Sequence, residues 1–236
     1  MNTSHILPQM NPPHHFNINN SPWVKDDINK WAAILQGEKP IRYKKRTRFF
    51  SSDDKLNHLY IMQTGLAVVS LFSTEGTEKH LFFQGTGSII GEVEMISQRR
   101  ALVSAEAITE CSIYKIPAEK IRVASSNPEF EKNLKESLSQ KVSVLLSQIY
   151  NLSFLQCSAR VAIILLHLVE QYGTETSQGF QISLRITHEQ LARLVNTSRV
   201  TISQILKKME RNEIIAKSSG KLLITDLYKL NAMAVR

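Results

Sequence analysis

The feature that most constrains this chain is the stretch 187–209, THEQLARLVNTSRVTISQILKKM, which predicts two helices joined by a tight turn. Thr187 precedes Gln190 by three residues, the spacing of a capping box at the start of a first helix. Asn196 tolerates the positive φ that a tight turn requires, and Ser198 can cap the second helix. The apolar residues of that second helix recur at i, i+3, i+4 and i+7, which predicts one buried stripe. They are Ile202, Ile205, Leu206 and Met209.

The opposite face of the second predicted helix carries cations and neutral hydrogen-bonding side chains but no carboxylate. A DNA major groove accepts a helix of this width, with phosphates at its rim and base edges on its floor. Gln204 can pair with adenine, and an exposed Val200 suits contact with a thymine methyl group. We interpret the stretch as a DNA reader, with an ordinary helical hairpin as the alternative. The predicted DNA contacts are Thr187, Ser198, Arg199, Val200, Thr201, Ser203, Gln204 and Lys207, with Lys217 and Lys221 beside the turn of a following two-stranded wing.

The net charge of +8 is unevenly distributed along the 236 residues. Residues 154–236 hold 11 Lys or Arg against 6 Asp or Glu, so the basic excess is largest around the predicted reader. A basic surface favours polyanions through counterion release. No apolar run approaches the roughly 20 residues of a membrane helix, and residues 1–20 lack the basic start and apolar core of a signal peptide. We therefore expect a cytoplasmic protein that binds double-stranded DNA and no membrane.

Four segments follow from the pattern of the chain. Residues 1–22 are rich in Asn, Pro and His without any Asp, Glu, Lys or Arg, and are expected to form a mobile tail. Residues 23–125 begin with a predicted helix over Trp23–Leu35 and continue as short strands separated by Gly turns, which is typical of a sandwich or small barrel able to hold a small molecule. Residues 126–153 are predicted to be one long helix, and residues 154–236 a winged helix-turn-helix domain. The expected fold class is α+β, with an N-terminal β-roll of the cupin-like jelly-roll kind.

The long predicted helix carries an apolar seam that favours self-association. Ser126 and Glu129 form a capping box, and Pro128 falls in the first turn, where proline is tolerated. The apolar residues then alternate spacings of four and three, the a/d pattern of a coiled coil. A helix buried on its own domain is the alternative. The predicted dimerisation residues are Leu134, Leu138, Val142, Leu145, Ile149 and Leu152.

A second candidate site interrupts the strand pattern at Gly91 and Glu92. The pattern predicts a short helix here, whose N-terminal amides can face the anionic group of a ligand. Arg99 and Arg100 follow within reach and suit an anionic effector. We predict these four residues as effector contacts, and surface ion pairing of the two arginines at a loop explains them equally well.

The remaining chemistry-bearing residues do not indicate an enzyme. Cys111 and Cys157 are too few for a disulfide scaffold and lack metal-ligand spacing. Cys111 is expected to be buried as a small apolar residue, and a redox switch at Cys157 is the less favoured alternative. His58 and His80 are the only histidines of the predicted roll and form no H-x-H pair, so we expect no metal site. No nucleophile stands in a pattern with a base.

The order of a β-roll, a Gly-Glu turn, a long helix and a winged helix-turn-helix resembles the cAMP receptor protein / fumarate-nitrate regulator (CRP/FNR) family of transcription factors. The resemblance runs from about Lys39 to the C-terminus and is carried by LYIMQTGLAVVSLF, IIGE, EAITECSIYKI and LARLVNTSRVTISQILKKMERNEII. It implies a homodimer in which an effector bound in the roll reorients the reader helices across the long helices. It also implies RNA polymerase as a partner.

Departures from the family pattern narrow the effector and the operator. The cyclic-nucleotide binders follow their Gly-Glu turn with an Arg-Ser or Arg-Thr pair, whereas this chain has Arg100-Ala101. We therefore keep cAMP or cGMP as an alternative effector. A factor set by oxidation of its two cysteines is a further alternative. The iron–sulfur branch needs several mostly N-terminal cysteines, and none precedes Cys111, so no iron–sulfur cluster is expected. The V-T-I-S run at 200–203 looks like the reader of the halogenated-phenol-sensing members, which predicts an A/T-rich inverted repeat.

Overall fold

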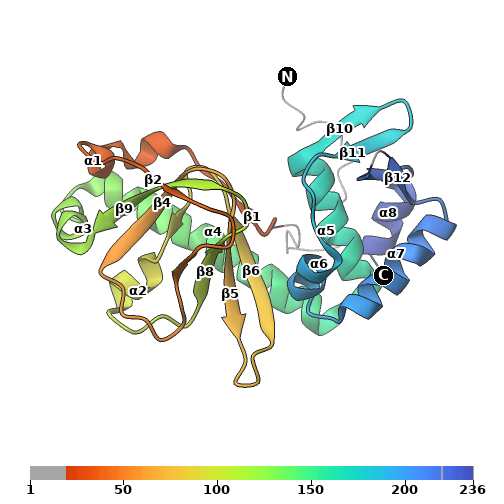
Figure 1. Ribbon diagram of the computed structural model, residues 1–236, viewed down its shortest axis with the longest axis horizontal. Coiled ribbons are helices and arrows are strands. Elements are labelled where there is room, and N and C mark those ends of the chain that lie inside the picture. The colour runs from red at the N-terminus through yellow and green to blue at the C-terminus, as the bar shows by residue number, and fades with distance from the viewer. Residues whose placement is uncertain (1–19, 219, 236) are drawn as a thin grey trace. The chain divides into compact units, whose positions relative to one another are not determined.

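The computed structural model describes residues 20–218 and 220–235 (Figure 1). The described residues form two compact units, one of residues 22–145 and one that contains residues 20–21 and those from 146 onward. The boundary between the units falls inside the long helix, not at either of its ends. Most of the predicted mobile tail, residues 1–19, lies outside the described residues.

The first unit is a β-roll built from a five-stranded and a four-stranded sheet, with helices before, between and after the strands. The strand order is β1-β6-β5-β8-β3 in one sheet and β2-β9-β4-β7 in the other. In Figure 1 the β5–β6 hairpin extends beyond the rest of the roll. The strands are β1 (Trp23–Val24), β2 (Ile41–Tyr43), β3 (Arg48–Phe50), β4 (His58–Thr64), β5 (Ala67–Phe72), β6 (Glu78–Gln84), β7 (Ile89–Ile90), β8 (Ser104–Ala107) and β9 (Cys111–Pro117). The helices are η1 (Ile28–Trp31), α1 (Ala32–Leu35), α2 (Glu92–Ser97), α3 (Ala118–Ala124) and the start of α4 (Pro128–Phe154).

Strand β4 separates two apolar cores, because alternate side chains of a strand point to opposite faces. Tyr60 and Met62 lie in the core inside the roll. Leu59 and Ile61 lie in a second core, which is closed by helical residues that include Trp31 and Phe130. The four-stranded sheet is therefore buried on both faces, and its second face fixes the start of α4 against the roll.

The segment 23–35 does not form the single predicted helix. Trp23 and Val24 pair in parallel with β6, and only then do the short helices η1 and α1 follow. The prediction was wrong because Asp27 caps a new helix, accepting a hydrogen bond from the Asn29 amide at 2.9 Å. A helix start inside the segment divides the apolar pattern between a strand and two short helices.

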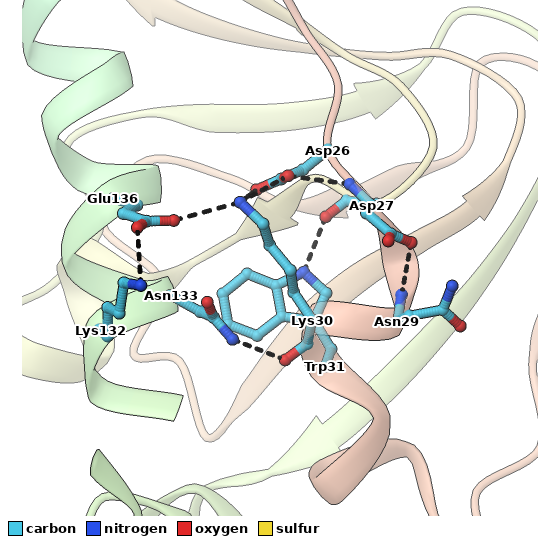
Figure 2. Close-up of polar contacts among 9 residues, drawn as sticks. Asp26, Asp27, Asn29, Lys30, Trp31, Lys132, Asn133 and Glu136 are labelled. Carbon is cyan, nitrogen blue, oxygen red and sulfur yellow. Dashed lines mark hydrogen bonds and ion pairs between the residues drawn. The ribbon is translucent and has the colours of Figure 1, made fainter. Parts of the chain in front are cut away.

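Polar contacts fasten this segment to α4 (Figure 2). The ammonium of Lys30 lies 2.9 Å from Asp26 and 3.2 Å from Glu136 of α4. The amide of Asn133, one turn before Glu136, donates to the Lys30 carbonyl at 3.0 Å. The Trp31 indole donates to the Gly87 carbonyl at 2.8 Å. The first turns of α4 are thus held by the roll and by the segment that precedes it.

The second unit is a winged helix-turn-helix. Its four antiparallel strands follow the order β10-β11-β13-β12. Val161, Leu165 and Leu168 of α5 are fully buried under the helix pair. The helices are α5 (Cys157–Tyr172), α6 (His188–Val195), α7 (Arg199–Arg211) and α8 (Leu227–Ala234), and the strands are β10 (Gly173–Thr176), β11 (Gly179–Ile182), β12 (Ile215–Ser218) and β13 (Lys221–Ile224).

Candidate functional site

Local hydrogen bonds set the turn between α6 and α7 as the sequence predicts. The Gln190 amide donates to the Thr187 hydroxyl at 3.1 Å, and the Thr187 amide donates to the Gln190 side chain at 3.0 Å. Asn196 follows α6 with a φ of 56°, in the left-handed region. The Ser198 hydroxyl accepts from the Thr201 amide at 3.0 Å and starts α7. The predicted caps and turn are therefore confirmed.

Two contacts that sequence reasoning missed tie α6 to its neighbours, one to α5 and one to α7. The Arg160 guanidinium, from α5, donates to the Val195 carbonyl at 3.0 Å and so satisfies the end of α6. His188, the first residue of α6, shares a hydrogen bond of 2.9 Å with the Ser203 hydroxyl in α7. Neither pair has a short sequence spacing, so no local signal indicates them.

The exposed face of α7 carries Arg199, Val200, Gln204 and Lys207. Val200 is 66% exposed, an unusual position for an apolar residue in the middle of a polar helix face. Ile202 and Met209 are buried on the other side. The helix therefore presents the predicted combination of cations, an amide and one apolar contact outward.

Three further predicted DNA contacts make hydrogen bonds within the unit. Ser203 is partly buried and donates to the Arg199 carbonyl at 3.1 Å, in addition to its bond with His188. Thr201 and Ser198 share a bond of 2.9 Å between their hydroxyls. Their roles toward DNA stay predictions, and Ser203 would have to exchange an internal bond for one to a base or phosphate.

The electrostatics of this face suit an anionic partner. Among the ion pairs of the described chain, none involves Arg199, Lys207 or Lys208. The positive end of the α7 dipole lies at the same end as Arg199. In the wing, Lys221 is exposed, and Lys217 lies 3.6 Å from Glu210 of α7. Lys217 therefore lies near a carboxylate of α7, and most of its side chain stays in solvent.

Helix α4 presents a different apolar stripe from the predicted one. Leu134 is buried in the core that α4 shares with the roll, and Leu138 and Leu145 pack against the cores of the roll unit. Leu146, which was not predicted, is exposed. The exposed apolar residues of α4 are Val142, Leu146, Ile149, Leu152 and Phe154. The exposed stripe of α4 thus contains Val142, Ile149 and Leu152 from the predicted set together with Leu146. Its role in self-association stays a prediction.

The Gly-Glu turn is closed by a residue that the sequence did not indicate. Gly91 has a φ of 94° and starts α2, and a Cβ there would press on Leu56. Glu92 is buried and forms an ion pair with Lys141 of α4, which is buried as well. Lys141 also donates to the Ile89 carbonyl at 2.6 Å. The carboxylate predicted as an effector contact is therefore already bound by the protein's own ammonium group.

The two predicted arginines do not join this pair. Arg100 donates to the Asp53 carbonyl at 2.7 Å and lies 3.7 Å from the Asp53 carboxylate, with most of its side chain in solvent. Arg99 is exposed, and the following Ala101 is buried. The surface ion pairing that the sequence left open is present at Arg100. Effector binding by Gly91, Glu92 and the arginines stays a prediction.

Cys111 is buried, and burial raises the pKa of its thiol. Its sulfur donates to the Leu66 carbonyl at 3.4 Å, as a small buried residue does. Cys157 is partly exposed at the start of α5. Among the described residues, no three His, Cys, Asp or Glu side chains come together as metal ligands. None of the helices in that part of the chain has both the length and the apolar character to span a membrane.

Comparison with known proteins agrees with this architecture. Residues 40–126 match the cyclic nucleotide-binding domain family and residues 159–233 match the Crp-like helix-turn-helix domain family. The cAMP-activated global transcriptional regulator CRP of Salmonella typhimurium is 29% identical over 188 residues, covering 78% of this chain and 87% of the relative. The CRP-like cAMP-activated regulator of Mycobacterium tuberculosis is 24% identical over 200 residues, covering 84% and 89%.

Solved structures share the fold. The c-di-GMP responsive regulator CLP of Xanthomonas campestris superposes with a TM-score of 0.76 at 22% identity, covering 85% of this chain and all of that one. CprK in complex with OCPA superposes with a TM-score of 0.69 at 15% identity, covering 91% and 97%. The relatives are transcriptional regulators and not enzymes. With both domains matched in this order, the chain belongs to the CRP/FNR family of DNA-binding transcription regulators.

Proposed function

We propose that this regulator is a homodimer that reads an A/T-rich inverted repeat and whose DNA affinity is set by a small molecule bound to the roll unit. The observation that carries the proposal is the exposed face of α7, where Arg199, Gln204 and Lys207 surround an exposed Val200. Gln204 suits adenine, Val200 suits the thymine methyl group, and the cations suit guanine or the flanking phosphates. Lys217 and Lys221 of the wing add phosphate contacts.

The exposed apolar stripe of α4 supports the dimer. Val142, Leu146 and Ile149 are each about half exposed or more, at the i, i+4, i+7 spacing of one helix face. A second copy placed by a two-fold axis would bury the same stripe on both helices. Two-fold symmetry then predicts half-sites about one helical turn apart, centre to centre.

The junction of α2 with α4 supports the proposed control of DNA affinity by a small molecule. A ligand that contacts α2 changes the surroundings of Lys141, and Lys141 belongs to the same helix as the dimer stripe. The effector therefore shifts the population toward the state that it binds better. A cAMP or cGMP site of the family kind would need a hydroxyl side chain after Arg100, where this chain has the buried Ala101. The Glu92 carboxylate is also already bound by Lys141. We rank these nucleotides below other small molecules.

In this proposal the regulator works in the cytoplasm and acts through RNA polymerase.

Selection of bound DNA from a random pool, with and without small molecules extracted from cells, tests the proposed operator and its dependence on an effector. We expect a palindrome with A/T-rich half-sites, enriched only when the extract is present. A G/C-rich core would contradict the predicted A/T-rich operator. Equal enrichment without the extract would contradict control by an effector. No enrichment in either condition would contradict DNA reading by α7.

A further inference from the structure

A groove of about 950 Å³ opens on the roll unit between α2, α3 and the first turns of α4. Its floor is apolar and mostly buried or half-buried. The floor residues are Leu56, Met95, Ala118, Ile121, Leu134 and Leu138. The volume is within the usual range of small-molecule sites, which combine an apolar lining with a few placed polar groups.

Exposed cations line the rim of this groove. Lys55, Arg99 and Arg122 all face solvent there. Lys135 is 3.4 Å from Glu131, so these two rim charges neutralise one another. No ion pair of the described residues involves the other three cations. The rim therefore has an excess of positive charge beside an apolar floor.

One acidic residue among the groove residues is buried. Glu94 is 7% exposed, and its carboxylate has only its own backbone amide as a hydrogen-bond partner within the described chain. Burial raises the pKa of this carboxyl group. A buried acceptor of this kind is costly unless a partner satisfies it. A ligand donor that reaches Glu94 would supply a second partner.

We propose that the groove binds a hydroxylated organic acid with an apolar body. The acid group lies among Lys55, Arg99 and Arg122, the apolar body covers the floor, and the hydroxyl donates to Glu94. Arg99 belongs also to the predicted effector contacts, so such a ligand is a candidate for the effector. Binding itself does not depend on the DNA-reading proposal, because it is measured without DNA.

Isothermal titration of the full chain with three matched probes tests the assignment. ω-Hydroxydecanoate has both polar ends, decanoate lacks the hydroxyl, and the corresponding decanediol lacks the acid. We expect the hydroxy acid to bind most tightly and the diol about tenfold more weakly, because a charge-assisted hydrogen bond contributes about that factor. Decanoate is expected to lie between the two.

Variants identify the groups that bind each end. Arg122→Gln is expected to weaken both acids about tenfold and to leave the diol unchanged. Arg42→Gln, an exposed arginine on β2 outside the groove, is the matched control and should change nothing. Glu94→Leu should abolish the preference for hydroxydecanoate over decanoate. Circular dichroism establishes that each variant is folded.

Three results would overturn the proposal. They are no binding of any probe to the folded wild type, a diol that binds as tightly as the hydroxy acid, and equal acid affinity of wild type and Arg122→Gln. If the acids bind but leave DNA affinity unchanged, the groove stands and its identification with the effector site fails. The site and the regulatory proposal are thus tested separately.

Discussion

The reader helices and the α2–α4 junction are both fixed by polar side chains, but over very different distances in sequence. Thr187 bonds Gln190 and Ser198 bonds Thr201, three residues away in each case. In the roll unit, Glu92 is bound by Lys141, 49 residues further on. Hydrogen bonds of the first kind sit at solvent-exposed helix ends, where water can replace them. The ion pair of the second kind is buried, where nothing replaces a lost partner.

The largest effect should come from breaking the buried pair. We expect Lys141→Met to lower the free energy of unfolding by about 3–5 kcal/mol, because it leaves the Glu92 carboxylate buried without its counter-charge. Urea unfolding followed by circular dichroism measures this. Lys135→Met removes an exposed ion pair from the same helix and is expected to cost about 0–1 kcal/mol.

A second variant separates charge from packing at this junction. Lys141→Met with Glu92→Gln should recover most of the lost stability, because no charge is then left buried. If Lys141→Met alone lowers the free energy of unfolding by less than about 1 kcal/mol, the pair is more hydrated than its burial indicates. The α2–α4 junction would then be no more sensitive to the loss of a partner than the exposed helix ends of the reader.

The reader is better tested by specificity than by stability. Val200→Glu should weaken binding to an A/T-rich half-site by about 1–3 kcal/mol, because a carboxylate accepts from the cytosine amino group and repels the thymine side of the groove. Fluorescence anisotropy with A/T-rich and G/C-containing duplexes measures both affinities. Val123→Glu places the same change at an exposed valine of α3 and should leave both unchanged.

The same difference in range explains what the sequence predicts and what it leaves out. The caps of α6 and α7, the turn at Asn196 and the burial of Ile202 and Met209 each depend on neighbours within one or two turns, so the pattern contains them. The predicted capping box of α4 at Ser126 was wrong, because Asn127 accepts from the Glu129 amide at 2.9 Å instead. The partner of Glu92 depends on how α4 packs on the roll, and no spacing encodes it. Periodicity likewise finds the apolar residues of α4 without saying which of them the roll covers. Leu134 is covered and Leu146 is not.

A smaller effect is expected at the N-cap of α7. Ser198→Ala removes the acceptor for the Thr201 amide and should cost about 1 kcal/mol of unfolding free energy, since water partly replaces the bond. Ser139→Ala, at an exposed interior position of α4, should change stability by less than about 0.5 kcal/mol. If both variants cost the same, the cap is not what fixes the start of the reader helix.

The smallest and most specific effect concerns pH and Glu94. Burial raises the pKa of this carboxyl group above its ordinary value of 4.5, with Glu92 raising it further and Lys141 opposing the rise. The folded state then binds the proton more tightly than the unfolded state. This contribution to stability is complete below the ordinary pKa and is lost as the pH rises through the folded-state pKa.

Glu94→Gln removes this titration while keeping the shape of the side chain. In urea titrations at a series of pH values, the difference in unfolding free energy, wild type minus variant, should fall as the pH rises above 4.5. Glu129→Gln, on the exposed first turn of α4, controls for the loss of one negative charge. A difference that stays flat with pH would mean that the Glu94 carboxylate finds as good an environment in the folded protein as in water. The hydroxyl of the proposed acid would then gain nothing by donating to Glu94.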